Sequence, residues 1–526
     1  MTTTITLSAD EYQALLSDHQ TLLAEQQRLT QQLRLVTVER DCLKERVDAF
    51  LHKLYAAKSE ARANPAQRDL FLNEAEALAP NGTPAAEEST PETVEVAGHN
   101  RKKRGRKPLD PHLPREIVRH ELPEAERLCG HDGALLVEIG AEISEQLDIV
   151  PQQVRVIQHH RIKYACPCCD NSLRVTPAPA RIIPKGLLTE TALAWVATAK
   201  YQDSLPLYRQ AALLSRFGGD LSRNTLAASM VRVGHAVQPI INLLRDHLLD
   251  ADLILGDETV VQVLKESGRA AQSKSYLWAQ MTGSGPPIRL FSYTPGRGGT
   301  HAQPLYDGIK PGAVLMSDGY EVYNAIAAVR GVIHLGCWAH ARRYFVEAEA
   351  AIPKAARGSE SLATQFIAAI SELYAIEAKA KDLSVEQRGQ QRQQLSKPVL
   401  LKIEGLLLQH LHAVTPGSLL GKALHYLSSQ WPKLIRFIDN GAWPIDNNLC
   451  ENAIRPFVVG RRNWLFCDTV AGARASANLY SLIETCKANR IDPYTYLVDL
   501  FRELPTAKTA EDFEALLPWN LADQTA

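Results

Sequence analysis

The chain has 526 residues, more than one ordinary hydrophobic core accommodates, so we expect several domains. With 45% hydrophobic and 22% charged residues it is globular in composition, and because it lacks a long apolar run and a secretory signal we expect a cytoplasmic protein with no membrane partner. Nine scattered cysteines indicate reduced thiols, and the net charge of -1 means that only local clusters of charge can indicate a nucleic-acid partner.

Residues 1–60 are expected to form a coiled-coil helix, with the helix itself over residues 10–55. Along it, an apolar side chain recurs at every seventh residue from Leu15 to Phe50. The alternate seam positions are mixed, because Leu33 is apolar but His19 and Arg40 are polar. A seven-residue repeat favours a left-handed coiled coil, so we expect a homodimer or higher oligomer. The alternative is an amphipathic helix that packs on its own protein.

Residues 61–108 are expected to be a flexible acidic linker that ends in a basic run. Residues 74–98 contain six glutamates and three prolines but no Lys or Arg, a composition that cannot bury a core. The segment 104–108 resembles an AT-hook, in which arginines enter a narrow A·T minor groove. The alternative is a solvated basic tail that contacts only phosphates. Both interpretations indicate DNA binding by Arg101, Lys102, Lys103, Arg104, Arg106 and Lys107.

Residues 109–183 are expected to form a small strand-rich, zinc-finger-like module. Cys166 and Cys169 have the Cys-x-x-Cys spacing of a zinc knuckle, and Cys129 lies upstream as a third ligand. The fourth ligand is then His131 or Asp132, since zinc accepts nitrogen and oxygen donors. Alternatively Cys168 joins an irregular site, or the module is free of metal.

Residues 184–250 are expected to be helical. A helix over residues 205–216, a turn containing Gly218 and Gly219, and a second helix from about Ser222 fit a helix-turn-helix. The alternative is an ordinary helical hairpin without a role in reading DNA.

From residue 251 the pattern changes to short apolar strands. Strands are expected at 253–264, 276–282 and 288–293, then a helix at 301–309, a strand at 313–317, a helix at 320–328, a strand at 332–336 and a helix at 338–350. This order predicts a ribonuclease H-like core. We place its first part at 251–350, a helical insertion at 351–440, its second part at 441–470 and a helical C-terminal region at 471–526, giving a multidomain α and α/β protein.

Two acids mark one edge of that predicted sheet. Asp257 lies in the first strand and Asp318 directly follows the fourth, and these strands are neighbours in a ribonuclease H-like sheet. Two close carboxylates repel each other unless a cation lies between them. Two Mg²⁺ ions would remove that repulsion and support an in-line displacement at phosphorus.

A third acid is expected from a helix that opens near residue 446. Glu451 lies within its first turns, and Leu449, Ala453, Ile454 and Phe457 are expected to give the helix an apolar face. Asp446 precedes the apolar stretch and is predicted to cap the helix N-terminus, which would leave Glu451 for the metal. Cations that follow on the same helix are expected to hold a phosphate backbone: Arg455, Arg461 and Arg462.

Several motifs resemble one known family. They occupy residues 252–264, 314–323, 336–343, 446–466 and 478–501. Together they strongly resemble the insertion sequence 66 family of bacterial transposases, over about residues 105–520 in order. The resemblance implies a ribonuclease H-like nuclease with an Asp-Asp-Glu triad at Asp257, Asp318 and Glu451, and accessory proteins encoded by the same element. Family members usually carry a second Cys-x-x-Cys near Cys129, but here the second cysteine is missing.

The segment 336–343 adds Cys337 and His340. The resemblance implies a supporting role for them at the active site, whereas the simpler interpretation, preferred for Cys337, is a buried thiol beside a packed or phosphate-facing histidine. Arg342 and Arg343 are expected to contact the DNA backbone.

The favoured interpretation is a nucleoid-associated transposase that uses Mg²⁺ or Mn²⁺ and one structural Zn²⁺. It would bind the terminal inverted repeats of its element, cleave strands and join them to target DNA. The alternative is a non-catalytic DNA-binding regulator derived from a transposase, against which three intact carboxylates argue. A dimeric coiled-coil scaffold would explain residues 10–55 alone.

Overall fold

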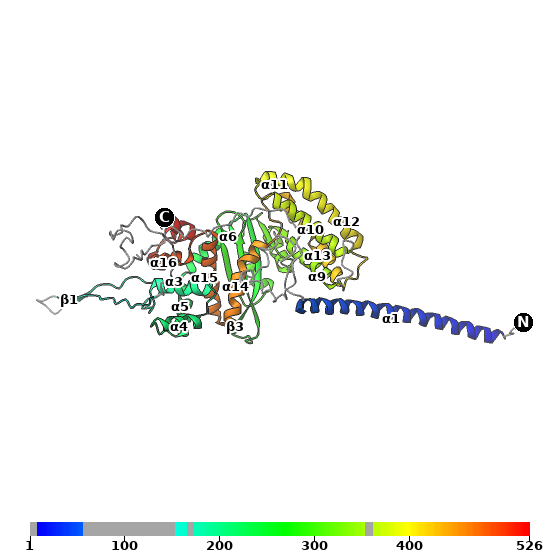
Figure 1. Cartoon of the computed structure of the whole chain (residues 1–526), viewed down its shortest axis with the longest axis horizontal. Coiled ribbons are helices and arrows are strands. Elements are labelled where there is room, and N and C mark those ends of the chain that lie inside the picture. The colour runs from blue at the N-terminus through cyan, green and yellow to red at the C-terminus, as the bar shows by residue number, and fades with distance from the viewer. Residues whose placement is uncertain (1–7, 56–152, 166–172, 353–360, 526) are drawn as a thin grey trace, which may run out of the picture. The chain divides into compact units, whose positions relative to one another are not determined.

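The computed structural model describes residues 8–55, 153–165, 173–352 and 361–525 (Figure 1). Helix α1 (Ala9–Tyr55) confirms the N-terminal helix. Its seam residues Leu22, Leu29 and Val36 are 69%, 52% and 62% exposed, so the apolar seam is open to a partner helix. Self-association itself stays a prediction.

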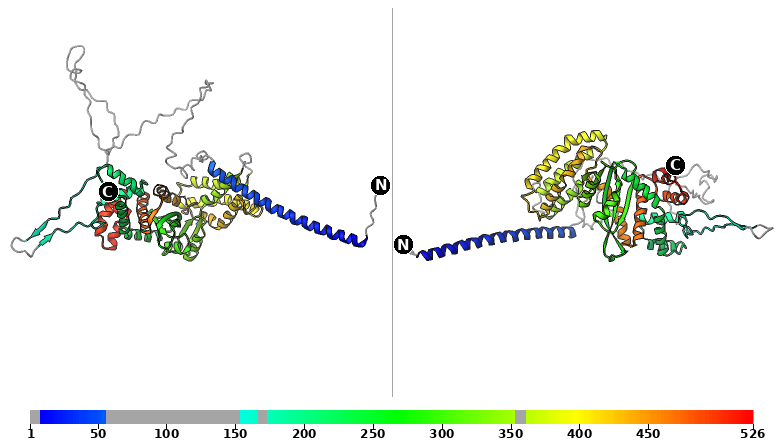
Figure 2. Two further views of the ribbon diagram at one scale, coloured as in Figure 1. Left: turned by 90° about the horizontal axis from the view of Figure 1, so that it is seen from below. Right: turned by 180° about the vertical axis from the view of Figure 1, so that it is seen from behind.

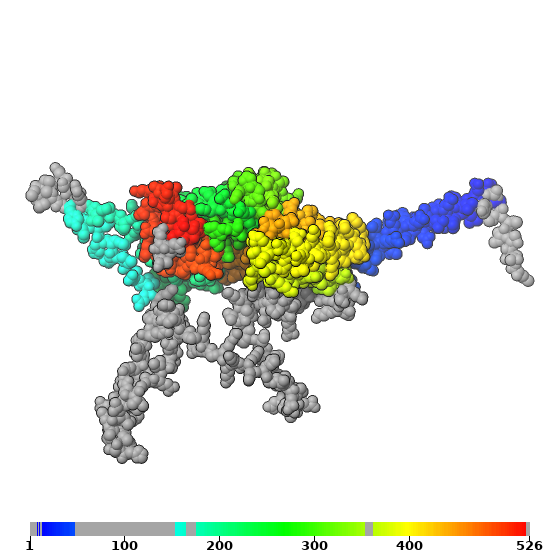
Figure 3. Space-filling model, turned by 90° about the horizontal axis from the view of Figure 1, so that it is seen from above, coloured from blue at the N-terminus to red at the C-terminus, as the bar shows by residue number. Residues whose placement is uncertain are grey.

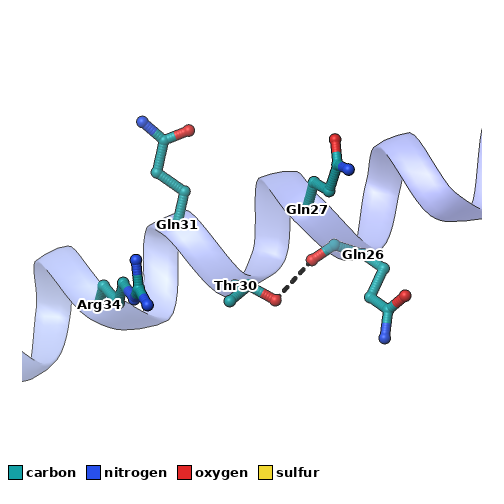
Figure 4. A pocket seen from close by; sticks show the side chains of 5 residues that line it. All are labelled: Gln26, Gln27, Thr30, Gln31 and Arg34. Carbon is teal, nitrogen blue, oxygen red and sulfur yellow. Dashed lines mark hydrogen bonds between the residues drawn. The ribbon is translucent and has the colours of Figure 1, made fainter.

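A shallow hollow on α1 holds only polar side chains. The Thr30 hydroxyl donates to the Gln26 carbonyl oxygen at 2.7 Å within the helix. Because all the lining residues come from one helix, the hollow is a groove between neighbouring side chains and not a built site. Figure 4 shows its lining: Gln26, Gln27, Thr30, Gln31 and Arg34.

One six-stranded mixed sheet organises the centre of the molecule. Its main path runs in the order β5-β4-β3-β6-β7, with antiparallel pairing from β5 to β3 and parallel pairing from β3 to β7. Leu255 of β3 pairs with Met316 of β6, which confirms that the first and fourth strands of this sheet are neighbours. The strands are β3 (Leu253–Lys265), β4 (Lys274–Thr282), β5 (Arg289–Thr294), β6 (Val314–Ser317), β7 (Ile333–Gly336) and β8 (Cys467–Thr469).

The strands β6 and β7 are almost entirely buried, as central parallel strands usually are. β8 pairs in parallel with the far end of β3, where Val263 lies opposite Cys467. The expected helix at 301–309 begins slightly earlier and continues as a 3₁₀-helix through Pro304. The elements between and after these strands are α7 (Gly299–Ala302), η3 (Gln303–Tyr306), α8 (Glu321–Arg330) and α9 (Trp338–Ala351).

A helical bundle follows α9 and has its own apolar core. Trp338 and Phe345 of α9 pack with Phe366 and Leu427, and the rings of Phe345 and Phe366 stack at 4.5 Å. The bundle helices lie together in both views of Figure 2, and Figure 3 shows them, in yellow, as one continuous surface. They are α10 (Leu362–Lys379), α11 (Val385–Gln391), the π-helix η5 (Arg392–Ser396), α12 (Lys397–His410), α13 (Leu419–Leu434) and the 3₁₀-helix η6 (Ile435–Asp439).

The sheet edge at β5 is covered by a C-terminal helix. Ser481 accepts a hydrogen bond from the Phe291 N–H at 2.8 Å, and Thr485 accepts one from the Arg289 N–H at 3.1 Å. Side chains of α15 thus satisfy donors that an edge strand would otherwise expose. This region contains α14 (Asn448–Trp464), α15 (Val470–Ala488), α16 (Pro493–Glu503), η7 (Leu504–Thr506), α17 (Ala510–Ala515) and α18 (Pro518–Thr525).

The expected helices before the sheet are present. The Ser222 hydroxyl accepts from the Thr225 N–H at 3.1 Å and caps α5, which follows α4 after a turn with Gly218 at φ 83°. This local geometry fits a helix-turn-helix and equally a plain helical hairpin. The helices are α3 (Glu190–Tyr201), α4 (Leu207–Arg216), α5 (Arg223–Ala236) and α6 (Gln238–Leu249).

Of the expected strand-rich module, the structure describes a two-stranded antiparallel pair, β1 (Lys163–Ala165) and β2 (Leu173–Val175). The basic run 101–107 and the zinc-ligand candidates at 129–132 and 166–169 lie outside the described residues. Among the helices that the structure describes, none combines the length and the apolar character needed to span a membrane.

Candidate active site

Strand β3 carries two adjacent acids that face opposite sides of the sheet, because side chains alternate along a strand. Thr259, two residues after Asp257 and on the same side of the strand, accepts a hydrogen bond from Arg461 of α14 at 3.3 Å, so Asp257 faces α14. Glu258 faces α8, where the Tyr323 hydroxyl donates to its carboxylate at 2.7 Å. The Glu258 N–H donates to Asp257 Oδ1 at 2.8 Å and so fixes one oxygen of that carboxylate.

Asp318 directly follows the last residue of β6, at the end of β6 that lies beside Asp257. Its Oδ1 accepts a hydrogen bond from the Tyr320 N–H at 2.9 Å, which holds the carboxylate in a tight turn before α8. A Cβ at Gly319 would come within 2.6 Å of the Tyr426 ring, so any other residue there would require that ring to move. The turn therefore fixes Asp318 close to Asp257, whose pKa it raises.

Glu451 lies in the first turn of α14, as the sequence predicts. Two contacts anchor that turn to the sheet: the Asn447 side-chain amide donates to the Gly256 carbonyl at 2.9 Å, and the Cys450 thiol lies 3.7 Å from the Ala279 carbonyl. The predicted apolar face is wrong at Leu449, which is 55% exposed. Cys450 is buried in its place, because the helix is rotated to present Cys450 to the sheet.

The prediction that Asp446 caps α14 is wrong in detail. The capping position belongs to Asn447, whose side chain is committed to Gly256 and makes no cap hydrogen bond. Asp446 lies one residue earlier and accepts from the Asn448 N–H at 3.1 Å and from the Tyr374 hydroxyl at 2.8 Å. Both of its oxygens are therefore engaged, whereas the charge of Glu451 acts on Asp257.

The electrostatics of the three acids suit a divalent cation. Burial raises the pKa of Asp257 well above its usual range, and the charges of Glu258, Asp318 and Glu451 raise it further. Such a group is costly when ionised unless a cation offsets the repulsion. Carboxylate oxygens are the ligands that Mg²⁺ and Mn²⁺ prefer, so the donor set formed by Asp257, Asp318 and Glu451 fits these ions.

Glu258 is a buried acid that the sequence reasoning missed. Its side chain is 1% exposed and forms an ion pair with Arg297, whose Nε donates to Glu258 Oε1 at 2.7 Å. Arg297 also lies 3.8 Å from the centre of the Tyr320 ring. Burial raises the pKa of Glu258, while Tyr323 and Arg297 oppose that rise. The available signal was the strand alternation itself, which puts the residue after Asp257 on the opposite, covered face.

The predicted DNA-contacting arginines lie on the two helices that flank the acids. From α9, Arg343 reaches Glu451, with Nη2 3.4 Å from Oε2, and Arg342 is half-buried. From α14, Arg461 donates to the Thr259 hydroxyl at 3.3 Å, Arg455 is half-buried and Arg462 is exposed. The two helices thus bring cationic side chains to the surroundings of the site.

Cys337 and His340 also reach the site. Cys337 is buried directly before α9, as the simpler interpretation of a buried thiol expects, and burial raises the pKa of that thiol. The His340 Nδ1 lies 3.6 Å from Glu451 Oε1, and burial lowers the pKa of His340 while the charge of Glu451 opposes that fall. His340 is therefore a neighbour of the third acid and not a surface residue.

Comparison with known protein families shows which family the chain belongs to. The model for the transposases of the IS66 family matches residues 185–475, a stretch that contains all three acids. The chain belongs to the IS66 transposase family. This confirms the resemblance found in the motifs of the sequence. An IS66 C-terminal element matches residues 481–519.

Two further models match the N-terminal third of this transposase-family chain. The zinc-finger binding domain of transposase IS66 matches residues 126–170, where the candidate zinc ligands lie. A model described as transposase C of IS166 homeodomain matches residues 42–118, which include the basic run. These matches support DNA binding by the N-terminal regions.

Relatives in Sinorhizobium fredii share most of the chain. The uncharacterized protein y4qI is 33% identical over 432 residues, which cover 79% of this chain and 77% of the relative. The uncharacterized protein y4hP is 30% identical over 493 residues, covering 90% of this chain and 88% of the relative. Each of these relatives therefore shares more than three quarters of its length with this chain.

Proposed function

We propose that this IS66-family chain cleaves and joins DNA strands, with Asp257, Asp318 and Glu451 as ligands of two Mg²⁺ or Mn²⁺ ions. The observation that carries the proposal is that the buried carboxyl of Asp257 in β3 is influenced by the charges of two acids from other elements, Asp318 after β6 and Glu451 at the start of α14. A ribonuclease H-like arrangement of the catalytic domain agrees with the strand order β5-β4-β3-β6-β7.

The protein's own part in the reaction is to hold its carboxylates in place. Backbone N–H groups bind one oxygen of Asp257 and one of Asp318, which orients both carboxylates and leaves a second oxygen on each for a cation. When bound, a pair of divalent ions would activate a water or a 3′-hydroxyl for attack on phosphorus and would stabilise the leaving oxygen. Because α14 is anchored on the sheet, Glu451 needs little reorganisation to complete the ligand set.

DNA would approach the acids between α9 and α14. Arg342, Arg343, Arg455, Arg461 and Arg462 would hold phosphates there, and Arg343 would release Glu451 as the DNA enters. The exposed side chain of Arg343, at 45%, allows this exchange, since a surface ion pair is weak.

The other regions would recognise the element and assemble the complex. We assign terminal-repeat binding to the basic run 101–107 and the zinc-finger region, with one Zn²⁺ on Cys129, Cys166, Cys169 and either His131 or Asp132. The exposed seam of α1 would join two copies of the chain. We also propose that accessory proteins encoded by the same element bind this chain, and that the complex is associated with the nucleoid.

Cleavage of element-end DNA tests the proposal. Purified full-length protein with the end DNA and Mg²⁺ should nick the 3′ end, whereas Asp257→Asn and Asp318→Asn should abolish nicking but keep DNA binding, because each removes a ligand charge without changing shape. Strand cleavage by either variant at the wild-type rate would refute the ligand assignment. Tight binding without cleavage by the wild type would favour a non-catalytic regulator.

A further inference from the structure

Three side chains of different chemistry meet beside the acids. The Cys337 thiol, a ring nitrogen of His340 and a carboxylate oxygen of Glu451 all lie within 4.8 Å of one another. Cys337 is the N-cap residue of α9, and His340 follows it in the first turn of that helix. Glu451 comes from the first turn of α14, so the cluster joins the starts of two helices, α9 and α14.

Two atoms of this cluster are buried without a partner. Among the residues that the structure describes, neither His340 Nδ1 nor Glu451 Oε1 has a hydrogen-bond partner, although the two face each other at 3.6 Å. Buried polar atoms are normally hydrogen-bonded, and a small ligand placed between this ion pair would satisfy both atoms. The Cys337 sulfur accepts a hydrogen bond from the Asn447 N–H at 3.2 Å, a contact that suits a thiolate.

The donor set selects the kind of ligand. Sulfur, imidazole nitrogen and carboxylate oxygen together are the ligands of Zn²⁺, whereas Mg²⁺ prefers oxygen alone. Ligand atoms around a tetrahedral zinc with bonds of about 2.0–2.3 Å lie roughly 3.3–3.8 Å apart. Small side-chain rotations would bring the three atoms to that spacing, and one coordination position would remain for water.

We propose that Cys337, His340 and Glu451 bind one Zn²⁺ ion, and that this ion inhibits strand cleavage by withdrawing Glu451 from the Mg²⁺ site. On binding, the thiol proton of Cys337 passes to solvent and the histidine binds as the neutral ring. The inhibitory half rests on the proposed function, because it takes Glu451 as a shared ligand. The zinc site itself rests only on the geometry of the cluster.

Zinc binding tests the site without reference to catalysis. Full-length protein is dialysed against buffered Zn²⁺ without DNA, and bound zinc is measured for the wild type, Cys337→Ser, His340→Gln and the control Cys450→Ser. Cys450 is a buried thiol next to Glu451 in the chain, but it contacts the Ala279 carbonyl instead of the cluster. The wild type and Cys450→Ser should bind one more zinc per chain than the other two variants. Equal zinc content in all four proteins would overturn the site.

A second measurement uses only the wild-type protein and therefore does not depend on variants that fold poorly. Wild-type protein, with the zinc-finger region already loaded with zinc, is titrated with Co²⁺ as a visible substitute for Zn²⁺. One further equivalent should produce sulfur-to-cobalt charge-transfer absorption from the Cys337 thiolate, which excess Mg²⁺ should not remove. Cobalt binding without that absorption would exclude Cys337 as a ligand and overturn the proposal.

Inhibition is then measured by adding Zn²⁺ to cleavage reactions in Mg²⁺, each variant being compared with its own rate in Mg²⁺ alone. The wild type and Cys450→Ser should lose cleavage over the range in which the site fills, and Cys337→Ser should not. Zinc binding without loss of cleavage would overturn the proposal that this ion inhibits the enzyme. No cleavage in Mg²⁺ alone by the wild type would count against the proposed function and leave the binding result standing.

Discussion

Asp257 is a carboxylate in surroundings that oppose its charge. Burial is the largest cause that raises its pKa, and three neighbouring acids add to it. A carboxyl whose pKa is raised in the folded state contributes stability that is fully present below the pKa of the unfolded chain, and this stability is lost as the pH rises through the folded-state pKa. Without metal, the fold should therefore lose stability towards alkaline pH at this position, and a bound cation should restore it.

A melting experiment can measure this competition between protons and metal. Saturating Mg²⁺ should raise the Tm by a few degrees at about pH 8, and the rise should shrink as the pH is lowered, because protons compete with the ion for the same carboxylate. Without metal, Asp257→Asn should melt higher than the wild type at about pH 8, because it removes the buried charge yet keeps the oxygen that accepts from Glu258. A Tm response to Mg²⁺ that is the same in wild type and Asp257→Asn would contradict this account.

The surroundings of Glu258 could not be predicted from the sequence. Its partner Arg297 lies 39 positions away in a loop, and a one-residue alternation decides which of two adjacent acids faces α14. The sequence pattern places an acid in the strand, but it does not reveal which side of the sheet each helix covers. Only the packing of α8 and α14 on opposite faces assigns the two carboxylates to different surroundings.

At the scale of elements, the strands and helices of the sheet region were predictable to within a few residues, because their apolar periodicity is strong. The adjacency of Leu255 and Met316 followed from the strand order. The start of α14 was less predictable: Cys450 rather than Leu449 faces the sheet, since Asn447 anchors the helix through Gly256. Such a rotation depends on tertiary hydrogen bonds that a helical pattern does not contain.

The basic run is an element whose predicted role can be measured directly. Replacing Arg104, Arg106 and Lys107 with Gln should weaken DNA binding, because each lost phosphate contact removes released counterions. The slope of the log of the binding constant against the log of the salt concentration should become shallower by roughly 1 per lost contact. An unchanged slope in this triple variant would show that the run does not touch DNA.

At the scale of the whole molecule, α1 presents apolar side chains that its own chain leaves exposed. A seven-residue seam of this kind is buried by a second helix, so we predict that the full-length protein self-associates through α1. Leu29→Arg should shift the protein to a lower molar mass in sedimentation equilibrium, because it places a charge in the seam. Leu23→Arg, on a leucine outside the seam that is 44% exposed against 52% for Leu29, should leave the molar mass unchanged. Equal masses for both variants would refute dimerisation through this seam.

The role of Glu451 as the third acid depends on how the whole helix α14 is placed against the sheet. Asp446 offers a matched control: it lies in the same segment, yet its oxygens accept from Asn448 and Tyr374. An uncharged Asn at this position keeps the acceptor for the Asn448 N–H, so Asp446→Asn should lose only about 1 kcal/mol of stability.

The most direct measurement is the rate of 3′-end cleavage as a function of Mg²⁺ concentration for the wild type, Glu451→Gln and Asp446→Asn. If Glu451 completes the metal site with Asp257 and Asp318, Glu451→Gln is inactive at every Mg²⁺ concentration while it still binds the end DNA. Asp446→Asn then follows the wild-type curve. An active Glu451→Gln together with an inactive Asp446→Asn would contradict the account and transfer the ligand role to Asp446.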